Sequence, residues 1–273
     1  MQNIVDAHWV KTHLNDTNLV LLDASMPTAG GKLSELQGHT IPGAIKFDLK
    51  KEFSDHNAPF PNTIPQPEIF QENAQELGIN TNNIIVVFDN LGIYSGPRVW
   101  WLFKTMGHEN VAVLNGGLPA WIDSGLDTTE IYKTPSQKGD FRAAFIPSNV
   151  ILFEQVKLNV EKADFIIIDA RSKGRFEGTA PEPREHLKSG KIPHSINLPF
   201  QDVLKNGYFK SPNELKDLFA HLGLSDRTIV YSCGSGLTAC IILLAGKIAG
   251  VESMKIYDGS WTEWAELNEL LNV

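Results

Sequence analysis

The sequence is organised as two copies of one pattern, and this repetition limits the folds open to the chain more than any other feature. Motifs of the first half recur in the second half in the same order and at a nearly constant offset. The matching pairs are LLDAS at 21–25 with IIDAR at 167–171, IPGAI at 41–45 with IPHSI at 192–196, helix-like stretches 67–77 and 212–222 that each run into Leu-Gly, and VAVLNGG at 111–117 with MKIYDGS at 254–260. We therefore expect two tandem domains with the same fold.

Short apolar runs and helical stretches alternate within each copy. The runs at 84–88 and 228–232 have the length and β-branched content of buried strands, and a long apolar, helix-like stretch follows each of them. Strands that alternate with helices indicate βα units around a mostly parallel sheet with helices on both faces. The sequence thus predicts an α/β protein built from two such domains.

A polar segment at 128–148 separates the two copies. It contains two prolines and a glycine and shows no sustained periodicity, which is typical of a connection between domains. We interpret it as a linker between an N-terminal domain at 1–127 and a C-terminal domain at 149–273. The motif DGSW at 258–261, which follows the last expected strand, is interpreted as a packing element.

Charge and hydropathy exclude several classes of function. The formal net charge is -8, and the 24 Lys and Arg residues are scattered rather than clustered, so the chain has no electrostatic footprint for nucleic acid or an anionic membrane. A small-molecule or protein partner is expected instead. The N-terminus has no basic, then apolar leader, and no apolar run approaches the roughly 18 residues of a membrane span. We expect a cytoplasmic protein without a membrane span.

The chain has only 2 cysteines, and both lie in one segment that leads from a strand into a helix. A secreted fold held by disulfides would use more cysteines and spread them along the chain. Cys240 lies on the apolar helix-like stretch and is best explained as a small buried side chain. Cys233 directly follows the apolar run at 228–232, so it requires a different explanation.

Cys233 opens the loop CGSGLTA at 233–239. This places the thiol at the carboxyl edge of a central strand, where open α/β sheets bind their ligands. The backbone N–H groups of a glycine-containing turn and the N-terminus of the following helix stabilise anions and favour the thiolate. Cys233 is therefore the predicted nucleophile. Asp89 stands at the corresponding point of the first copy, so only the second copy is expected to be active.

Two other readings of this loop are weaker. The letters GSGLTA followed by Asp258 resemble a dinucleotide fingerprint, but too few residues follow Asp258 for the remaining strands of that fold, and the first copy lacks the fingerprint. A cysteine phosphatase needs an arginine at the end of the loop to grip phosphate, and Ala239 occupies that position. Both readings are disfavoured.

With these motifs in place, the two halves resemble tandem rhodanese domains, and nearly the whole chain is similar to the two-domain sulfurtransferases. The loop at 233–239 resembles the active loop of the 3-mercaptopyruvate type, whereas thiosulfate-specific members typically carry Arg and Lys directly after the cysteine. Thiosulfate is a compact dianion and gains from two cations in the loop. Mercaptopyruvate presents a thiol and a distant carboxylate, which suits Gly234 and Ser235.

The resemblance also implies roles for individual residues. Arg175 in RFEGT and Arg184 in EPR match the family's two substrate-binding arginines and would hold an α-keto carboxylate. Ser235 would polarise the keto group or help to move the thiol proton. The remaining loop residues expected to bind the donor or the transferred sulfur are Gly234, Gly236, Leu237 and Thr238.

The implied activity is ping-pong transfer of sulfur from 3-mercaptopyruvate through a persulfide on Cys233 to a thiol such as thioredoxin, or to cyanide, with no metal or organic cofactor. Thiosulfate as donor, and a persulfide carrier or sensor that turns over no small donor, remain the alternatives. Many members of the mercaptopyruvate type form a proton relay from the loop serine, a histidine and an acid. Asn62 occupies the position of that histidine and Lys50 the position of that acid, so the resemblance supplies no relay.

Overall fold

The computed structural model describes residues 1–28, 30–224 and 227–271. It divides into two compact units. The first comprises residues 1–55, 64–146 and 206–209, and the second comprises 56–63, 147–205 and 210–273. Residues 272–273, the end of the expected C-terminal domain, lie outside the described residues.

The first unit contains one parallel sheet with the strand order β1-β5-β4-β2-β3. Its strands are short, and β4 at the centre holds the longest ladder together with β2. The strands are β1 (Ile4–Val5), β2 (Leu19–Asp23), β3 (Ile45–Lys46), β4 (Ile84–Phe88) and β5 (Val111–Leu114), and the helices are α1 (Ala7–His13), α2 (Pro67–Glu76), α3 (Gly96–Thr105) and α4 (Gly117–Asp123).

The second unit repeats this sheet strand for strand, in the order β6-β12-β11-β7-β8. The strands are β6 (Val150–Ile151), β7 (Phe165–Asp169), β8 (Ile196–Asn197), β11 (Thr228–Ser232) and β12 (Lys255–Tyr257). The helices are α5 (Phe153–Lys162), α6 (Lys173–Glu177), α7 (Pro212–His221), α8 (Ala239–Ala249) and α9 (Ser260–Leu271). Three short elements, η1 (Pro147–Asn149), η2 (Phe200–Val203) and β9 (Leu204–Lys205), belong to this unit, and β10 (Tyr208–Phe209) belongs to the first. The predicted α/β fold with two mostly parallel sheets is confirmed.

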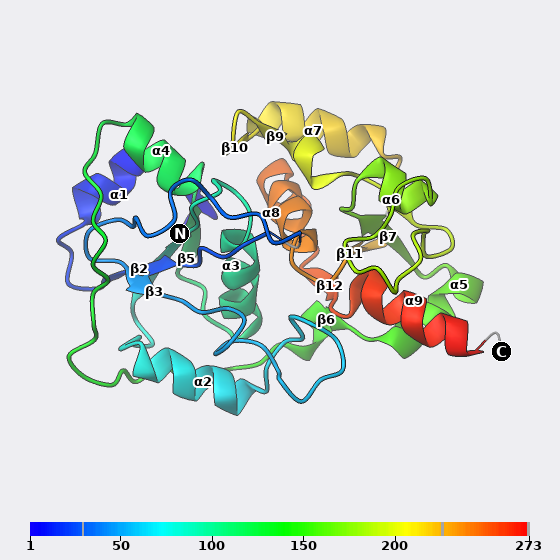
Figure 1. Ribbon diagram of the computed structural model, residues 1–273, viewed down its shortest axis with the longest axis horizontal. Helices are drawn as coiled ribbons and strands as arrows, with labels where there is room; N and C mark the ends of the chain where they lie inside the picture. Colours follow the sequence, from blue (N-terminus) through cyan, green and yellow to red (C-terminus); the bar gives the residue numbers. More distant parts are fainter. Residues whose placement is uncertain (29, 225–226, 272–273) are drawn as a thin grey trace. The chain divides into compact units, whose positions relative to one another are not determined.

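Each sheet is covered on both faces, because the middle residues of its central strands are apolar and buried. Alternate residues of β4 point to opposite faces, and Val86 and Phe88 pack in one cluster with Val10 of α1 and Trp121 of α4. In the second unit Ile167 and Val230 pack with α5 and α9, while α7 and α8 pack against each other on the other side of the sheet (Figure 1). Burial of these runs on both faces is the reason that they lack an alternating polar pattern.

The polar segment at 128–148, which follows α4, packs against the first unit over much of its length. Thr129 exchanges backbone hydrogen bonds with Thr40, and Phe141 is buried against the rings of Phe70 and Phe103. The segment between them keeps an irregular backbone because its partners are isolated carbonyls and side chains rather than a strand. Within the described residues, no helix has the length and apolar character needed to cross a membrane.

Candidate active site

Cys233 lies at the carboxyl end of β11, the central strand of the second sheet. The parallel register pairs Ser232 with Asp169, so the residues just after β7 and β11 meet at one edge of the sheet. Cys233 is a free thiol with only 1% of its surface exposed. Cys240 also has a reduced thiol, but it is buried inside α8, where the thiol donates to the Gly236 carbonyl. The two cysteines therefore have different surroundings, as the sequence predicts.

The loop after Cys233 is folded around the side chain of Ser260. The Ser260 hydroxyl oxygen accepts hydrogen bonds from the amides of Cys233 and Gly236, each at 3.1 Å, and its own hydrogen goes to the Tyr257 carbonyl. Ser260 is wholly buried and has a left-handed backbone with φ 53°. The Gly236 amide, which was expected to face the transferred sulfur, is thus directed to Ser260, and Gly236 with φ 74° serves the turn instead.

The first copy shows what an anion in such a loop looks like. Asp89 follows β4 as Cys233 follows β11, and its buried carboxylate accepts hydrogen bonds from four backbone amides at 2.9–3.0 Å. The donors are Leu91, Tyr94, Ser95 and Gly96. Burial raises the pKa of the Asp89 carboxyl, and the four N–H groups partly offset that rise.

The corresponding amides of the second copy have no comparable acceptor. Ser235 lies two residues after Cys233, as Leu91 lies two residues after Asp89, and the other three positions are matched by their distance from the start of α8. The corresponding amides are therefore those of Ser235, Leu237, Thr238 and Ala239. None of these amides donates a hydrogen bond to another group in the part of the chain that the structure describes. An anion on the Cys233 side chain would provide what the Asp89 carboxylate provides in the first copy. The loop is therefore built to hold a negative charge at the sulfur.

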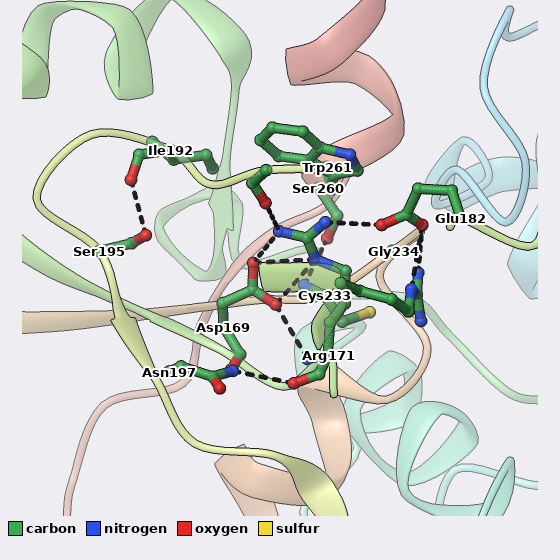
Figure 2. Close-up of polar contacts among 12 residues, drawn as sticks. Asp169, Arg171, Glu182, Ile192, Ser195, Asn197, Cys233, Gly234, Ser260 and Trp261 are labelled. Carbon is green, nitrogen blue, oxygen red and sulfur yellow. Dashed lines mark hydrogen bonds and ion pairs between the residues drawn. The ribbon is translucent and has the colours of Figure 1, made fainter. Parts of the chain in front are cut away.

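A buried cluster of charges lies beside this loop (Figure 2). The Arg171 guanidinium is inaccessible to solvent, stacks on the Trp261 ring at 4.3 Å and forms ion pairs with Asp169 at 2.7 Å and Glu182 at 2.8 Å. It also donates to the Gly190 carbonyl at 2.6 Å. Because each charge is paired and hydrogen-bonded, the cluster avoids the cost of an isolated buried ion.

Arg175, from α6, extends this cluster to the catalytic loop. Its Nε and Nη2 both donate to Glu182 Oε2, and 22% of its side chain is exposed. A Cβ atom on Gly234 would lie 2.9 Å from Arg175 Nη2, so a larger residue after the nucleophile would require the guanidinium to shift from its contact with Glu182. The structure thus brings Arg175, Gly234 and Cys233 together.

Arg184 reaches the same loop through one intermediate. Its Nη1 donates to the Thr262 hydroxyl at 3.0 Å, and that hydroxyl donates to the Gly234 carbonyl at 2.6 Å. Arg184 is partly exposed. Both predicted arginines therefore lie beside the cysteine loop, one in contact with Gly234 and one through Thr262.

Ser235 is 8% exposed and contacts Asn62, whose carboxamide nitrogen lies 2.9 Å from the Ser235 hydroxyl oxygen. Leu237 is buried, and Thr238 is the N-cap of α8 without a side-chain capping hydrogen bond. Lys50 belongs to the first unit and is exposed.

Sequence reasoning missed Arg171, Glu182 and Ser260 as parts of this site. The repeat itself held one signal, because Arg171 replaces Ser25 of the first copy directly after the matching strand. The motif at 258–261 was interpreted as packing, and in the structure its serine also braces the cysteine loop.

Comparisons with known proteins agree with this arrangement of fold and loop. The family model of the rhodanese-like domain matches residues 6–124 and again residues 152–267. The chain therefore belongs to the rhodanese-like family and carries two copies of its domain. Together with a free cysteine in an anion-stabilising loop, this makes the chain a sulfurtransferase of the tandem type.

Named relatives narrow the class. The chain is 38% identical to the 3-mercaptopyruvate sulfurtransferase of Escherichia coli K12, over 97% of this chain and 96% of the relative. It is 37% identical to the thiosulfate sulfurtransferase of Mus musculus, over 96% of this chain and 91% of the relative. The crystal structure of Escherichia coli SseA, a 3-mercaptopyruvate sulfotransferase with the rhodanese fold, superposes with a TM-score of 0.85 and 35% identity, covering 96% and 99% of the two chains.

Proposed function

We propose that the chain transfers sulfur from 3-mercaptopyruvate to a thiol or cyanide acceptor through a persulfide on Cys233, with release of pyruvate. The second copy, residues 149–273, is the catalytic domain, and the first copy, residues 1–127, is an inactive domain connected by residues 128–148. Cytoplasmic thiols are the expected acceptors, thioredoxin among them, because a free cysteine nucleophile requires a reducing compartment.

The observation that carries the proposal is the position of Arg175 over Gly234. A guanidinium fork held by Glu182 and placed one residue from the nucleophile suits the carboxylate of an α-keto acid. Arg184 supplies a second cation on the Thr262 side of the loop. The loop itself carries no cation, and thiosulfate would need its charges neutralised at the sulfur rather than at a distance.

The chemistry follows from these positions. The Cys233 thiolate attacks the sulfur of bound 3-mercaptopyruvate, a sulfur–sulfur bond forms, and the carbon–sulfur bond breaks with its electron pair passing to the enolate of pyruvate. The substrate's thiol proton is released from the new persulfide, and the enolate takes up one proton to become pyruvate. The cysteine sulfur is oxidised and the former sulfur-bearing carbon is reduced, so no external oxidant is needed.

The amides of Ser235, Leu237, Thr238 and Ala239 would then hold the anionic outer sulfur, as the first copy's amides hold Asp89. An acceptor thiolate attacks that outer sulfur and returns Cys233 to the thiolate. Preorganised donors lower the energy of the charged intermediate because they need no rearrangement at the moment of transfer.

Incubation with 3-mercaptopyruvate in the absence of acceptor tests the proposal. Intact mass and peptide mapping should show one added sulfur atom, located on Cys233, with pyruvate formed in equal amount. Cys233→Ser should take up no sulfur, whereas the matched control Cys240→Ala, which alters a cysteine inside α8, should load normally. An unmodified wild-type mass while pyruvate accumulates would contradict the persulfide mechanism.

Thiosulfate is the second candidate donor, because a thiosulfate sulfurtransferase is nearly as similar to this chain as the mercaptopyruvate enzymes are. Comparison of kcat/KM for the two donors decides between them. The double variant Arg175→Ala/Arg184→Ala separates an enzyme from a persulfide carrier. We expect it to lose mercaptopyruvate turnover by about 100-fold or more if the arginines bind the donor, and to keep a persulfide delivered by another protein if the chain is a carrier.

A further inference from the structure

The segment at 56–63 comes from the first half of the sequence but packs as part of the second unit. Within it, the Asn62 carboxamide nitrogen lies 2.9 Å from Ser235 Oγ and 3.2 Å from the Ser235 carbonyl oxygen. A single side-chain amide thus contacts both polar groups of the serine that stands two residues after the nucleophile. This pair of contacts also determines which group is the donor in each hydrogen bond.

A backbone carbonyl oxygen can only accept hydrogen bonds. The Asn62 atom that faces the Ser235 carbonyl must therefore be the amide nitrogen rather than the amide oxygen. That nitrogen carries two hydrogens, one for the carbonyl and one for the hydroxyl oxygen. The Ser235 oxygen is consequently an acceptor toward Asn62, and its own hydrogen must point to another group.

No acceptor for the Ser235 hydroxyl hydrogen occurs among the residues that the structure describes. Ser235 itself is buried, and its amide is one of those left for the anion at Cys233. A hydroxyl that is fixed by its oxygen and has an uncommitted hydrogen beside the nucleophile is a preset hydrogen-bond donor to whatever binds there.

The backbone of Asn62 is adapted to this contact. Its φ is 61°, in the left-handed region that asparagine tolerates better than most residues other than glycine. The conformation explains why the position does not favour a β-branched or large apolar side chain. It also provides a clean way to remove the amide, since glycine adopts the same backbone without strain.

We propose that Asn62 is a positioning residue that holds Ser235 as a fixed, non-titrating hydrogen-bond donor to the keto oxygen of the sulfur donor. This inference rests on the proposed function, because it requires a donor in which negative charge develops on a keto oxygen as the carbon–sulfur bond breaks. A carboxamide neither gains nor loses a proton near neutral pH, so Asn62 aims the serine hydroxyl without acting as an acid or a base.

Three variants test the inference with 3-mercaptopyruvate and thiosulfate as separate donors. Asn62→Gly removes the amide and keeps the backbone conformation, and we expect the ratio of the two kcat/KM values, mercaptopyruvate over thiosulfate, to fall about 10-fold, chiefly through kcat. Asn62→Asp replaces the donor by an acceptor that draws the serine hydrogen to itself, so the ratio should fall further, to the level of Ser235→Ala. Thiosulfate has no keto oxygen and serves as the internal reference.

The double variant Asn62→Gly/Ser235→Ala shows whether Asn62 acts through the serine. If it does, the glycine substitution should change nothing further once the hydroxyl is absent. Asn62→His adds a second readout, because a group that titrates near 6.5 should introduce a pH dependence in mercaptopyruvate kcat that the wild type lacks.

Two results would overturn the inference: an unchanged donor ratio in both Asn62→Gly and Asn62→Asp, or additive effects in the double variant. The rate of Cys233 alkylation reports whether the loop is intact in each protein, and a variant with altered alkylation is replaced by Asn62→Ser. Failure of the wild type to load sulfur from mercaptopyruvate would instead refute the proposed function, and with it this inference.

Discussion

Glu182 holds two arginines with one carboxylate. Its Oε1 pairs with Arg171, which is inaccessible to solvent, and its Oε2 pairs with Arg175, which is partly exposed beside the catalytic loop. Because Arg171 fixes the Glu182 carboxylate, that carboxylate also holds the Arg175 guanidinium in one orientation. A substrate-binding arginine that is already oriented loses less rotamer freedom when the ligand arrives, and this loss is a main cost of binding.

Glu182→Gln should therefore weaken donor binding more than it slows the chemical step. The amide retains one accepting oxygen but turns an NH2 group toward one of the guanidiniums. We expect the KM for 3-mercaptopyruvate to rise about 10-fold, with a smaller change in kcat. The matched control is Glu177→Gln, which removes the same charge from an exposed pair with Lys173 on α6. Equal KM values in the two variants would show that Glu182 does not position Arg175.

At this scale the sequence predicted candidate site residues but not the side chains that contact them. Cys233 and the two arginines stand in contiguous motifs whose residue types have a direct chemical meaning. The supporting contacts join residues far apart in the chain, such as Asn62 with Ser235 and Ser260 with Cys233, and no local pattern encodes such a pairing.

Among the elements, α8 connects the catalytic loop to the core. It begins directly after the loop and packs against β11 and α7. A glycine at its third turn, Gly246, permits this close approach, because a Cβ atom there would lie 2.5 Å from the Tyr231 hydroxyl and 3.3 Å from the Phe219 ring. The buried Tyr231 hydroxyl has no hydrogen-bond partner in the described part of the chain, and burial raises the pKa of Tyr231 above its usual value.

Gly246→Ala should destabilise the protein by about 2 kcal/mol, because the overlap outweighs the roughly 1 kcal/mol that alanine gains over glycine in a helix. Tyr231→Phe removes the overlapping oxygen and an unsatisfied buried group, so it should be neutral or slightly stabilising. The combined variant should recover most of the loss, as measured by urea unfolding. A combined effect equal to the sum of the single effects would place the strain elsewhere.

Element prediction succeeded for the strongly apolar runs and for the longer helix-like stretches. The apolar runs became β4 and β11, and the helix-like stretches became α2 and α7 at nearly the expected residues. It failed for α6, which has 5 residues and is too short to show a helical period. The Gly/Pro-rich sequence around Arg175 gave the sequence reasoning a function for this segment but not its helical form.

On the scale of the whole molecule, both copies contain the loop after the central strand, but the first copy has Asp89 where the second has Cys233. The first copy's loop keeps its amides directed at one point, but the Asp89 carboxylate fills that point permanently. The Asp89 side chain thus gives the amides of the first copy's loop an acceptor within their own domain.

Asp89→Ala should cost about 3 kcal/mol in the free energy of unfolding, since buried N–H groups lose their acceptor. Asp89→Asn, which keeps an accepting oxygen, should cost less, and the exposed Asp123→Ala serves as the control. Because burial raises the pKa of Asp89 above 3.8, the unfolded chain loses this proton first as the pH rises. The stability difference between wild type and Asp89→Ala should therefore shrink as the pH rises above that value, and constant differences would contradict the assignment.

The repeat predicted the number of domains and their fold. It did not predict that residues 56–63 and 206–209 pack with the other copy's unit, because periodic similarity describes what the two copies share. These short segments differ between the copies, and their placement depends on contacts that only the folded chain reveals.

The placement of Asn62 has a consequence for chimeric proteins. If the second copy of this chain were joined to the first copy of a relative, the residue beside Ser235 would be inherited from the relative, although the nucleophile, both arginines and the loop would be unchanged. Under the proposed role of Asn62, donor preference would then depend partly on the first half of the chain, which contains no nucleophile. If Asn62 positions Ser235 as proposed, neither half could be exchanged without a change in donor preference.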